Sequence, residues 1–290
     1  MAKYVPDITT NRWVIIAEGR TKRPVDSKPQ ASNLNKICVF CPGFERIPGE
    51  EVFRIGEGKP FERGWQVRVI NNKYPITDYH EVIIHSPDHD LEINKMPASA
   101  VETIIRVYRQ RFLANAVNGH VIIFNNVGDA AGASINHPHS QLVVVPKQIN
   151  IDTLNLEPIV NVIFENDFFS VFCPDFSQWP FEVWIAPKTK GKLFGDITDN
   201  EIVALAPVLS DTIRRLLHHL ESGEHFHPGM PMVMFKGGPA YNFYIHHGQD
   251  WYIRIIPRLV HRAGFELGTG IQVNIVDPAD VAETLMQEIR

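Results

Sequence analysis

The alternation of apolar and polar positions predicts several strands in the first half of the chain. In a segment such as residues 65–71, every second side chain falls on one face, which is typical of a half-buried strand. Alternating segments and short apolar runs occur at residues 12–16, 65–71, 79–87, 119–128 and 140–146. Residues 24–64 are rich in proline and glycine and only weakly periodic, so we predict an irregular segment there.

A helix is predicted within residues 96–118, where apolar side chains recur at i, i+3 and i+4. The second half repeats this order, with strands at residues 168–174 and 181–188, a helix at about 199–220, and strands at 231–239 and 251–258. The segments "YHEVIIHSP" and "PFEVWIAPK" are alike, as are "SQLVVVP" and "WYIRIIP". This repetition predicts an α+β protein built from two similar halves, residues 1–150 and 151–290, each an antiparallel sheet with helices packed on it.

Charge and composition narrow the classes of function. The 290-residue chain has a formal net charge of −5, which argues against binding to nucleic acid through bulk electrostatics. The first residues lack the apolar core of a signal peptide, and no stretch has the length of a membrane span. We therefore expect a cytoplasmic protein that binds neither nucleic acid nor membrane.

The segment "NVGDAAGASINHPHSQLVVVP" combines two histidines with a loop of small residues. Small residues let backbone N–H groups approach a ligand closely. Pro138 fixes the backbone between His137 and His139, which orients both rings. In a regular strand the two rings would share a face, but a proline-containing lead-in need not be regular, so they can have different partners.

A second candidate site is the Cys-x-x-Cys pair formed by Cys38 and Cys41. Two thiolates at this spacing make half of a tetrahedral zinc site. The alternative is a pair of buried, small apolar side chains. The other two ligands would come from elsewhere in the chain, and His85, His89 and His137 are the candidates between which spacing does not choose.

Several motifs together resemble one family. These are "HPHSQ", Asn126 and Ser134 before it, the Cys-x-x-Cys pair, "SPDHD", the N-terminal "RWVIIAEGRTKRP", "NKYP" and "AGFELGTG". In this order along nearly the whole chain they resemble the galactose-1-phosphate uridylyltransferase family, a branch of the histidine triad superfamily. The resemblance implies that each half is histidine-triad-like. The first half would carry the catalytic and zinc sites, and the second would complete the nucleotide-sugar site.

The resemblance also implies roles for individual residues. The nucleophile would be His139, assisted by Gln141 and Ser134. A structural zinc ion would be held by Cys38, Cys41, His89 and His137. Substrate contacts would come from Arg20, Arg23, Asn72, Lys73, Tyr74, Asn126 and Glu266. Family members form dimers in which the basic N-terminal turn can reach the partner's site, so a homodimer is expected.

The expected activity is that of a nucleotidylyltransferase, with UDP-glucose and a hexose 1-phosphate such as galactose 1-phosphate as substrates and a nucleotidyl-histidine intermediate. Two departures from the family bear on this expectation. Ser140 replaces the glycine of many relatives, and Tyr252 and Arg254 replace the histidines of a second metal site. The alternatives are an ADP-sugar or dinucleotide phosphorylase or adenylyltransferase, and a non-catalytic nucleotide-binding relative.

Overall fold

The computed structural model describes residues 2–7, 12–22, 38–151, 154, 156–222 and 238–287. The chain divides into two compact units. Unit one comprises Met1–Glu92, Thr103–Asn125 and Ser134–Leu154, and unit two comprises Ile93–Glu102, Asn126–Ala133 and Asn155–Arg290. Both units combine antiparallel strands with helical segments, which confirms the predicted α+β class. The duplication, with its division after residue 150, stays a prediction.

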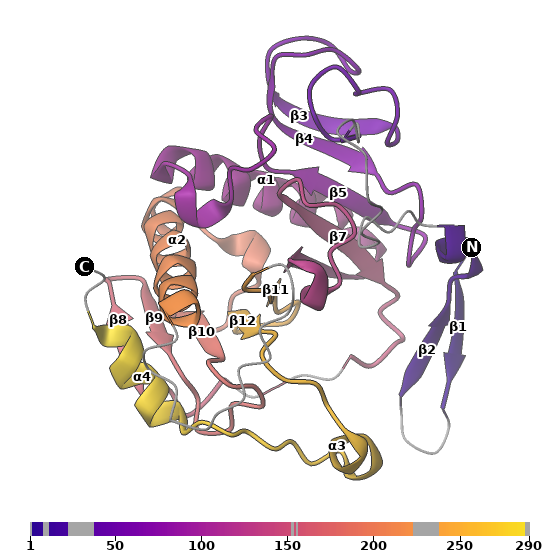
Figure 1. The fold of residues 1–290 in the computed structure, drawn as a ribbon. Helices are drawn as coiled ribbons and strands as arrows, with labels where there is room; N and C mark the ends of the chain where they lie inside the picture. Colours follow the sequence, from indigo (N-terminus) through magenta and orange to yellow (C-terminus); the bar gives the residue numbers. More distant parts are fainter. Residues whose placement is uncertain are drawn as a thin grey trace. The chain divides into compact units, whose positions relative to one another are not determined.

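The strands of unit one follow the order β3-β4-β5-β7-β6, and each neighbouring pair is antiparallel; β3, β4, β5 and β7 are labelled in Figure 1. Their bounds are Glu51–Gly56 for β3, Trp65–Asn71 for β4, His80–Ile84 for β5, His120–Val127 for β6 and His139–Val145 for β7. The long helix α1, Ala98–Asn115, connects β5 to β6 along the chain and is divided between the two units. The predicted strands are therefore confirmed for β4, β5, β6 and β7, and the predicted helix is confirmed for α1.

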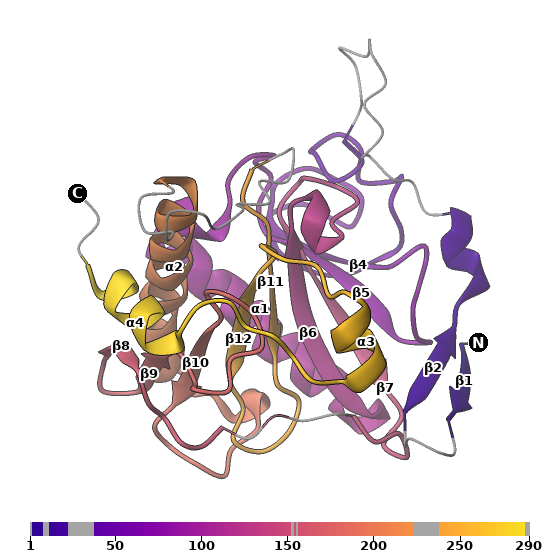
Figure 2. The ribbon, with the colours of Figure 1, turned by 60° about the horizontal axis from the view of Figure 1, so that its bottom comes forward.

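The motif histidine at position 139 begins a strand that is paired on both sides. Strand β7 lies between β5 and β6, and Figure 2 shows these strands side by side. Its residues His139 and Gln141 pair with Ile84 and Val82 of β5. Because both edges of β7 are hydrogen-bonded, the backbone that carries these two side chains is held rigidly.

The prediction of an irregular run at residues 24–64 is wrong for β3. This strand pairs with β4 through two register shifts, which disturb the regular alternation of its side chains. It also buries an ion pair, in which Arg68 Nε lies 2.6 Å from Glu51 Oε2 and the two side chains are 0% and 1% exposed. Charged residues on a buried strand remove the apolar pattern on which the prediction depended.

Unit two contains strands in the order β11-β12-β10-β9-β8, also antiparallel. They span Val162–Glu165 for β8, Phe169–Phe172 for β9, Val183–Pro187 for β10, Tyr241–Ile245 for β11 and Ile253–Pro257 for β12. The helices are α2, Asp199–Ser222, α3, Gly264–Thr269, and α4, Pro278–Met286. Of the predicted strand at 231–239, residues 231–237 lie outside the described residues.

Short 3-10 turns connect many of these elements. They are Glu18–Lys22, Ile93–Lys95, Ala116–Asn118, Asp129–Ala131 and Phe194–Asp196. Helix α2 is amphipathic and contacts β9 and α4 (Figure 1). Its apolar side chains, including Ile202, Leu205, Leu209, Ile213 and Leu216, are buried. This agrees with the helix predicted from its 3.6-residue period.

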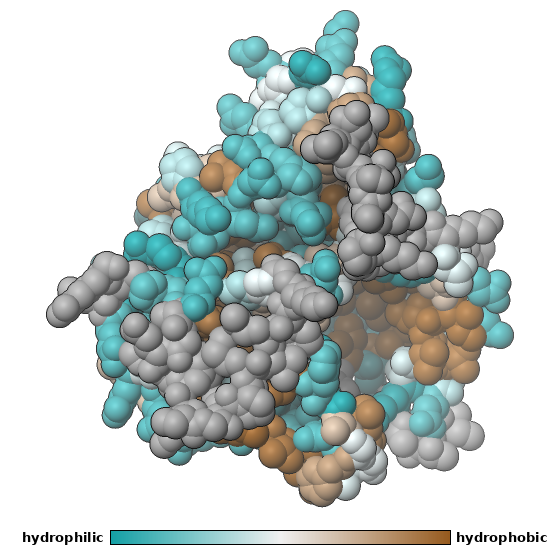
Figure 3. Space-filling model, in the orientation of Figure 1, coloured by the Kyte–Doolittle hydropathy of each residue, from teal (hydrophilic) through white to brown (hydrophobic). Residues whose placement is uncertain are grey.

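Strands β1, Lys3–Pro6, and β2, Trp13–Ile16, form a separate two-stranded hairpin. Val14 and Ile16 on β2 are 58% and 40% exposed. Figure 3 shows a hydrophobic area, in brown, where Figure 1 places this hairpin. Among the helices of the described residues, none combines the length and the apolar character that a membrane crossing requires.

Candidate functional site

Four side chains predicted as metal ligands lie together in unit one. Cys38, Cys41, His89 and His137 each offer one ligand atom, and all four atoms lie within 4.8 Å of one another. His137 Nδ1 is 3.7 Å from Cys38 Sγ and 3.6 Å from Cys41 Sγ. His89 Nδ1 is 3.4 Å from Cys41 Sγ.

These separations fit a tetrahedral metal ion. Zinc bonds of about 2.3 Å to sulfur and about 2.0–2.1 Å to nitrogen give sulfur–nitrogen edges of about 3.6 Å. His137 Nε2 lies 2.8 Å from the Ser86 carbonyl oxygen, so it donates a proton there and Nδ1 keeps its lone pair toward the cysteines. The donor set therefore fits a structural metal site, in which four protein ligands leave no position for a reacting water.

The third histidine candidate, His85, has a different role. His85 Nε2 is 2.9 Å from Ser140 Oγ, and Tyr108 OH contacts both of these atoms at 3.0 and 2.5 Å. Burial, followed by the charges of His139 and His137, lowers the pKa of His85 to about 3. His85 is therefore neutral near pH 7 and acts as a hydrogen-bonding partner of Ser140 in strand β7.

Burial also makes the Cys41 thiol harder to ionise. Burial and the neighbouring Cys38 raise the pKa of the Cys41 thiol to about 11. A metal ion needs the thiolate, so it must displace a proton that Cys41 would otherwise hold up to that pH.

Metal retention is therefore expected to fall as the pH is lowered. Below the raised pKa of Cys41, each pH unit should weaken the apparent metal affinity by at least about tenfold, because binding releases at least one proton. Competition with a chromophoric chelator at pH 6, 7 and 8 measures this slope. Cys173→Ala, which removes the buried cysteine that is not in the cluster, should leave the slope unchanged. A slope of zero would contradict thiolate coordination.

The first motif histidine orients the second through its backbone. His139 Nδ1 lies 2.8 Å from the His137 carbonyl oxygen, so Nδ1 carries the proton and donates it. Nε2 then carries the lone pair. The two rings of the motif thus have different partners, one in the metal cluster and one in a pocket.

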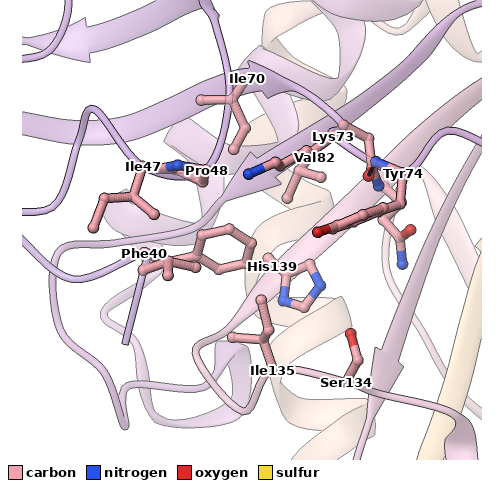
Figure 4. Close-up of a pocket in the computed structure, with 13 residues that line it drawn as sticks. Phe40, Ile47, Pro48, Ile70, Lys73, Tyr74, Val82, Ser134, Ile135 and His139 are labelled. Atoms are coloured by element: carbon pink, nitrogen blue, oxygen red, sulfur yellow. Dashed lines mark hydrogen bonds between the residues drawn. The ribbon is translucent and has the colours of Figure 1, made fainter. Parts of the chain in front are cut away.

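The His139 ring lines a cavity of about 190 Å³. Figure 4 shows the ring between the aromatic rings of Phe40 and Tyr74, with Ser134 and Ile135 on one side. The apolar part of the wall is formed by Val39, Phe40, Ile47, Pro48, Ile70, Val82 and Ile135. The polar part is formed by Asn72, Lys73, Tyr74, Ser134, His139 and Gln141. The cavity thus joins an apolar surface that fits a flat base to polar groups that fit an anion.

The metal loop forms one wall of this cavity. Val39 and Phe40 lie between the two cysteine ligands, and Phe40 packs with Trp65, Ile70, Val82 and Ile84 in a buried cluster. The Phe40 ring meets the His139 ring edge-on, with 5.2 Å between their centroids. A metal that holds this loop would therefore also hold an aromatic wall of the cavity.

The remaining predicted residues are distributed as follows. Arg20 Nη1 donates to the Tyr74 carbonyl oxygen at 2.7 Å, which ties the N-terminal turn to the pocket segment. Arg23 lies outside the described residues. In unit two, Asn126 Oδ1 accepts from Asn242 at 2.8 Å, and Glu266 accepts from the Ala263 N–H at 2.9 Å at the start of α3.

Tyr252 and Arg254, noted above as a departure from the family resemblance, are engaged with protein groups. Arg254 donates two hydrogen bonds to Glu182, at 2.7 and 2.8 Å, inside unit two. Tyr252 stacks on His246, with ring centroids 4.7 Å apart and planes 1° from parallel. An internal cation and an aromatic stack thus occupy these positions.

Two features of the site were missed from the sequence. Phe40 stands inside the Cys-x-x-Cys pair and lines the cavity, and its aromatic ring between the two cysteines was the signal that could have indicated this. His80 was placed on a strand without a role. Its Nε2 lies 3.0 Å from Gln141 Oε1.

The fold and the arrangement of the site agree with the family that the motifs resemble, and comparisons with known proteins point to the same family. Residues 71–146 match the family model described as the N-terminal domain of galactose-1-phosphate uridyl transferase. The chain is 28% identical to ADP-glucose phosphorylase of Arabidopsis thaliana, covering 97% of this chain and 91% of that protein. It is 24% identical to galactose-1-phosphate uridylyltransferase of Thermotoga maritima, covering 96% of each.

A solved structure of the Arabidopsis thaliana ADP-glucose phosphorylase with bound ADP-glucose superimposes with a TM-score of 0.73 at 26% identity, over 100% of both chains. These findings confirm the relationship to the galactose-1-phosphate uridylyltransferase family. The named relatives are enzymes of nucleotidyl transfer, and they differ in the nucleotide that they use.

Proposed function

We propose that the protein is a nucleotidylyltransferase that moves a nucleoside monophosphate between phosphate acceptors through a covalent intermediate on His139. One observation carries this proposal. The His137 carbonyl oxygen accepts the Nδ1 proton of His139, so the lone pair of the ring is on Nε2. The same ring lines the cavity. A neutral imidazole can approach an anionic phosphorus without electrostatic repulsion.

In the first step His139 Nε2 attacks the α-phosphorus of a nucleoside diphosphate sugar. A nitrogen–phosphorus bond forms, and the anhydride bond to the bridging oxygen breaks. The sugar 1-phosphate leaves with that electron pair. The His137 carbonyl oxygen stabilises the positive charge that develops on the imidazole ring.

In the second step a phosphate oxygen of the acceptor attacks the same phosphorus, and the bond to Nε2 breaks. The acceptor becomes the new nucleotide product, and His139 regains its lone pair. Gln141 and Ser134 line the cavity and can donate to the non-bridging oxygens in both steps. The two steps predict ping-pong kinetics.

The metal site would serve this chemistry indirectly. We propose zinc as the ion, held by Cys38, Cys41, His89 and His137, because two thiolates and two imidazoles at tetrahedral spacing favour it. When bound, it supplies no reacting water. It fixes the segment whose carbonyl oxygen orients His139.

The first candidate for the substrates is UDP-glucose with a hexose 1-phosphate, as in galactose-1-phosphate uridylyltransferase. The match of residues 71–146 to that family model supports it. Asn72, Lys73 and Tyr74 of the matched segment line the cavity, as expected of nucleotide contacts. The predicted homodimer and the contacts from Arg23, Asn126 and Glu266 belong to the same proposal.

A second candidate is an ADP-sugar phosphorylase, in which inorganic phosphate is the acceptor. The similarity to ADP-glucose phosphorylase over 97% of the chain favours it. Both candidates use the same intermediate and differ in the base and in the acceptor.

Mass spectrometry after incubation with single donors tests the proposal. With the correct donor the intact protein should gain one uridylyl or adenylyl group, and peptide mapping should place it on His139. The adduct should then be discharged by hexose 1-phosphate in a transferase, or by inorganic phosphate in a phosphorylase. Binding of UDP-glucose and ADP-glucose without any mass change would instead indicate a non-catalytic nucleotide-binding protein.

A further inference from the structure

We propose that His80 is a positioning residue that sets Gln141 as a hydrogen-bond donor toward the transferred phosphoryl group. This inference rests on the proposed function and extends it to residues outside the catalytic motif. His80 is the first residue of β5, is 3% exposed, and pairs with Val143 of β7, two residues beyond Gln141, so His80 and Gln141 are diagonal neighbours across the β5–β7 pair.

The backbone determines the protonation of the His80 ring. The Ile76 N–H donates to His80 Nδ1 at 2.9 Å. A backbone amide is always a donor, so Nδ1 must be the acceptor and carries no proton. The proton of the neutral ring is therefore on Nε2.

The ring in turn determines the orientation of the Gln141 amide. His80 Nε2 lies 3.0 Å from Gln141 Oε1, so the ring donates to the amide oxygen. A reversed amide would place its NH₂ group against the ring N–H, which is unfavourable. Gln141 lines the cavity, and with its oxygen engaged it presents an NH₂ donor to a ligand.

Asn72 is oriented in the same way. Its Oδ1 accepts from the Tyr74 N–H at 2.8 Å, so its NH₂ group is the part available to a ligand. Asn72 Nδ2 is 3.1 Å from His80 Nε2, but with the ring proton on Nε2 the two atoms are both donors, so His80 does not orient Asn72.

The Ile76 N–H, acting through His80, thus fixes the Gln141 amide as a donor, and the Tyr74 N–H fixes the Asn72 amide in the same way before a ligand binds. Lys73 adds a cation to the same part of the wall. Preorganised donors stabilise charge in a transition state because they need no reorientation during the reaction. We infer that this part of the cavity selects phosphoryl oxygens, and that His80 acts on the reaction only through Gln141.

Two substitutions of His80 separate this role from simple packing. In His80→Asn the side-chain amide reaches the place of Nδ1, so it can keep the bond from Ile76 but loses the donor to Gln141. In His80→Gln the longer side chain reaches the place of Nε2 and can restore that donor. Both variants leave His139, the four candidate metal ligands and the residues that line the cavity unchanged.

The measurement is the single-turnover rate of nucleotidyl transfer to His139, with the donor identified by mass spectrometry, together with donor KM, thermal unfolding and metal content. We expect His80→Asn to lower the rate about 10- to 100-fold with little change in KM, since removing one preorganised donor costs about 10²–10³-fold. His80→Gln should recover most of that rate. Equal rates in His80→Asn and the wild type would overturn the inference, as would equal losses in both variants.

Gln141→Glu gives an independent test in case His80→Asn does not fold. The carboxylate has the same shape and still accepts from His80 Nε2, but it offers no donor and repels phosphate. We expect at least a 100-fold loss of rate with unchanged metal content. Full activity in Gln141→Glu would overturn the inference. A wild-type protein that forms no adduct with any donor overturns the proposed function and the role of His80 with it, whereas an active wild type beside unaffected variants overturns the role of His80 alone.

Discussion

Replacing His139 with alanine should abolish nucleotidyl transfer, with a fall in kcat of about 10⁴-fold or more. Among the residues that the structure describes, His139 is the one histidine that lines the cavity, and its Nδ1 is bonded to the His137 carbonyl oxygen. No second imidazole is therefore in place to replace it. The His139 side chain is absent from the metal cluster, so metal content should remain at the wild-type level. Exchange of labelled sugar 1-phosphate into the nucleotide sugar measures the loss, and metal analysis of the same sample tests the integrity of the cluster.

His261→Ala is a suitable control, because His261 is an exposed histidine of unit two. It should keep wild-type exchange. If His139→Ala still exchanges label at a rate within tenfold of the wild type, His139 is not the nucleophile. A variant that loses metal together with activity would show that the ring supports the cluster rather than the reaction.

The second large effect is expected from loss of the metal ion proposed for the Cys/His cluster. Cys41→Ser, or extraction with a strong chelator, should lower the unfolding temperature by about 10 °C or more, since a structural zinc site contributes several kcal/mol to folding. Nucleotide affinity should also fall, by at least about tenfold, because Phe40 lies in the loop that the proposed metal ion would hold and packs against His139. Thermal unfolding and titration with nucleotide sugar measure the two effects.

Cys173→Ala again serves as the control, because Cys173 is buried in unit two and lies outside the cluster. It should retain metal and nucleotide affinity. An extracted protein that binds nucleotide sugar as tightly as the untreated protein would show that the loop keeps its position without the ion. In that case the aromatic wall of the cavity would be independent of the metal.

The sequence predicted the strands whose side chains alternate between apolar and polar or are apolar throughout. Burial of one face of a strand produces the alternation, and burial of both faces produces the apolar run. Strands β4, β5, β7 and β12 are of this kind. Strand β3 was not predicted because it buries Glu51 in an ion pair with Arg68, and a buried charged residue interrupts the apolar periodicity from which strands are predicted.

The candidate metal ligands show that the spacing of residues along the chain cannot by itself choose between nearby histidines. His85 and His89 are four residues apart and were equal candidates from the residues alone. The structure separates them because His85 directly follows β5 and bonds Ser140, whereas His89 lies in the next loop beside Cys41. Only the family resemblance, which carries the ligand set as a whole, chose His89.

The role of His80 could not have been found from the sequence. It depends on which ring nitrogen carries the proton, and that follows from the Ile76 N–H, four residues earlier in the chain. A turn must fold before that amide can reach the ring. No residue type at position 80 or 76 indicates it.

The acceptor that orients His139 is a main-chain oxygen of His137, and this has a consequence for genetic experiments. Every amino acid supplies that oxygen, so a complete mutational scan of position 137 would report on coordination of the ion and never on the bond itself. Chemical synthesis that weakens this one oxygen, for example by converting the peptide group between residues 137 and 138 to a thioamide, would reveal its contribution.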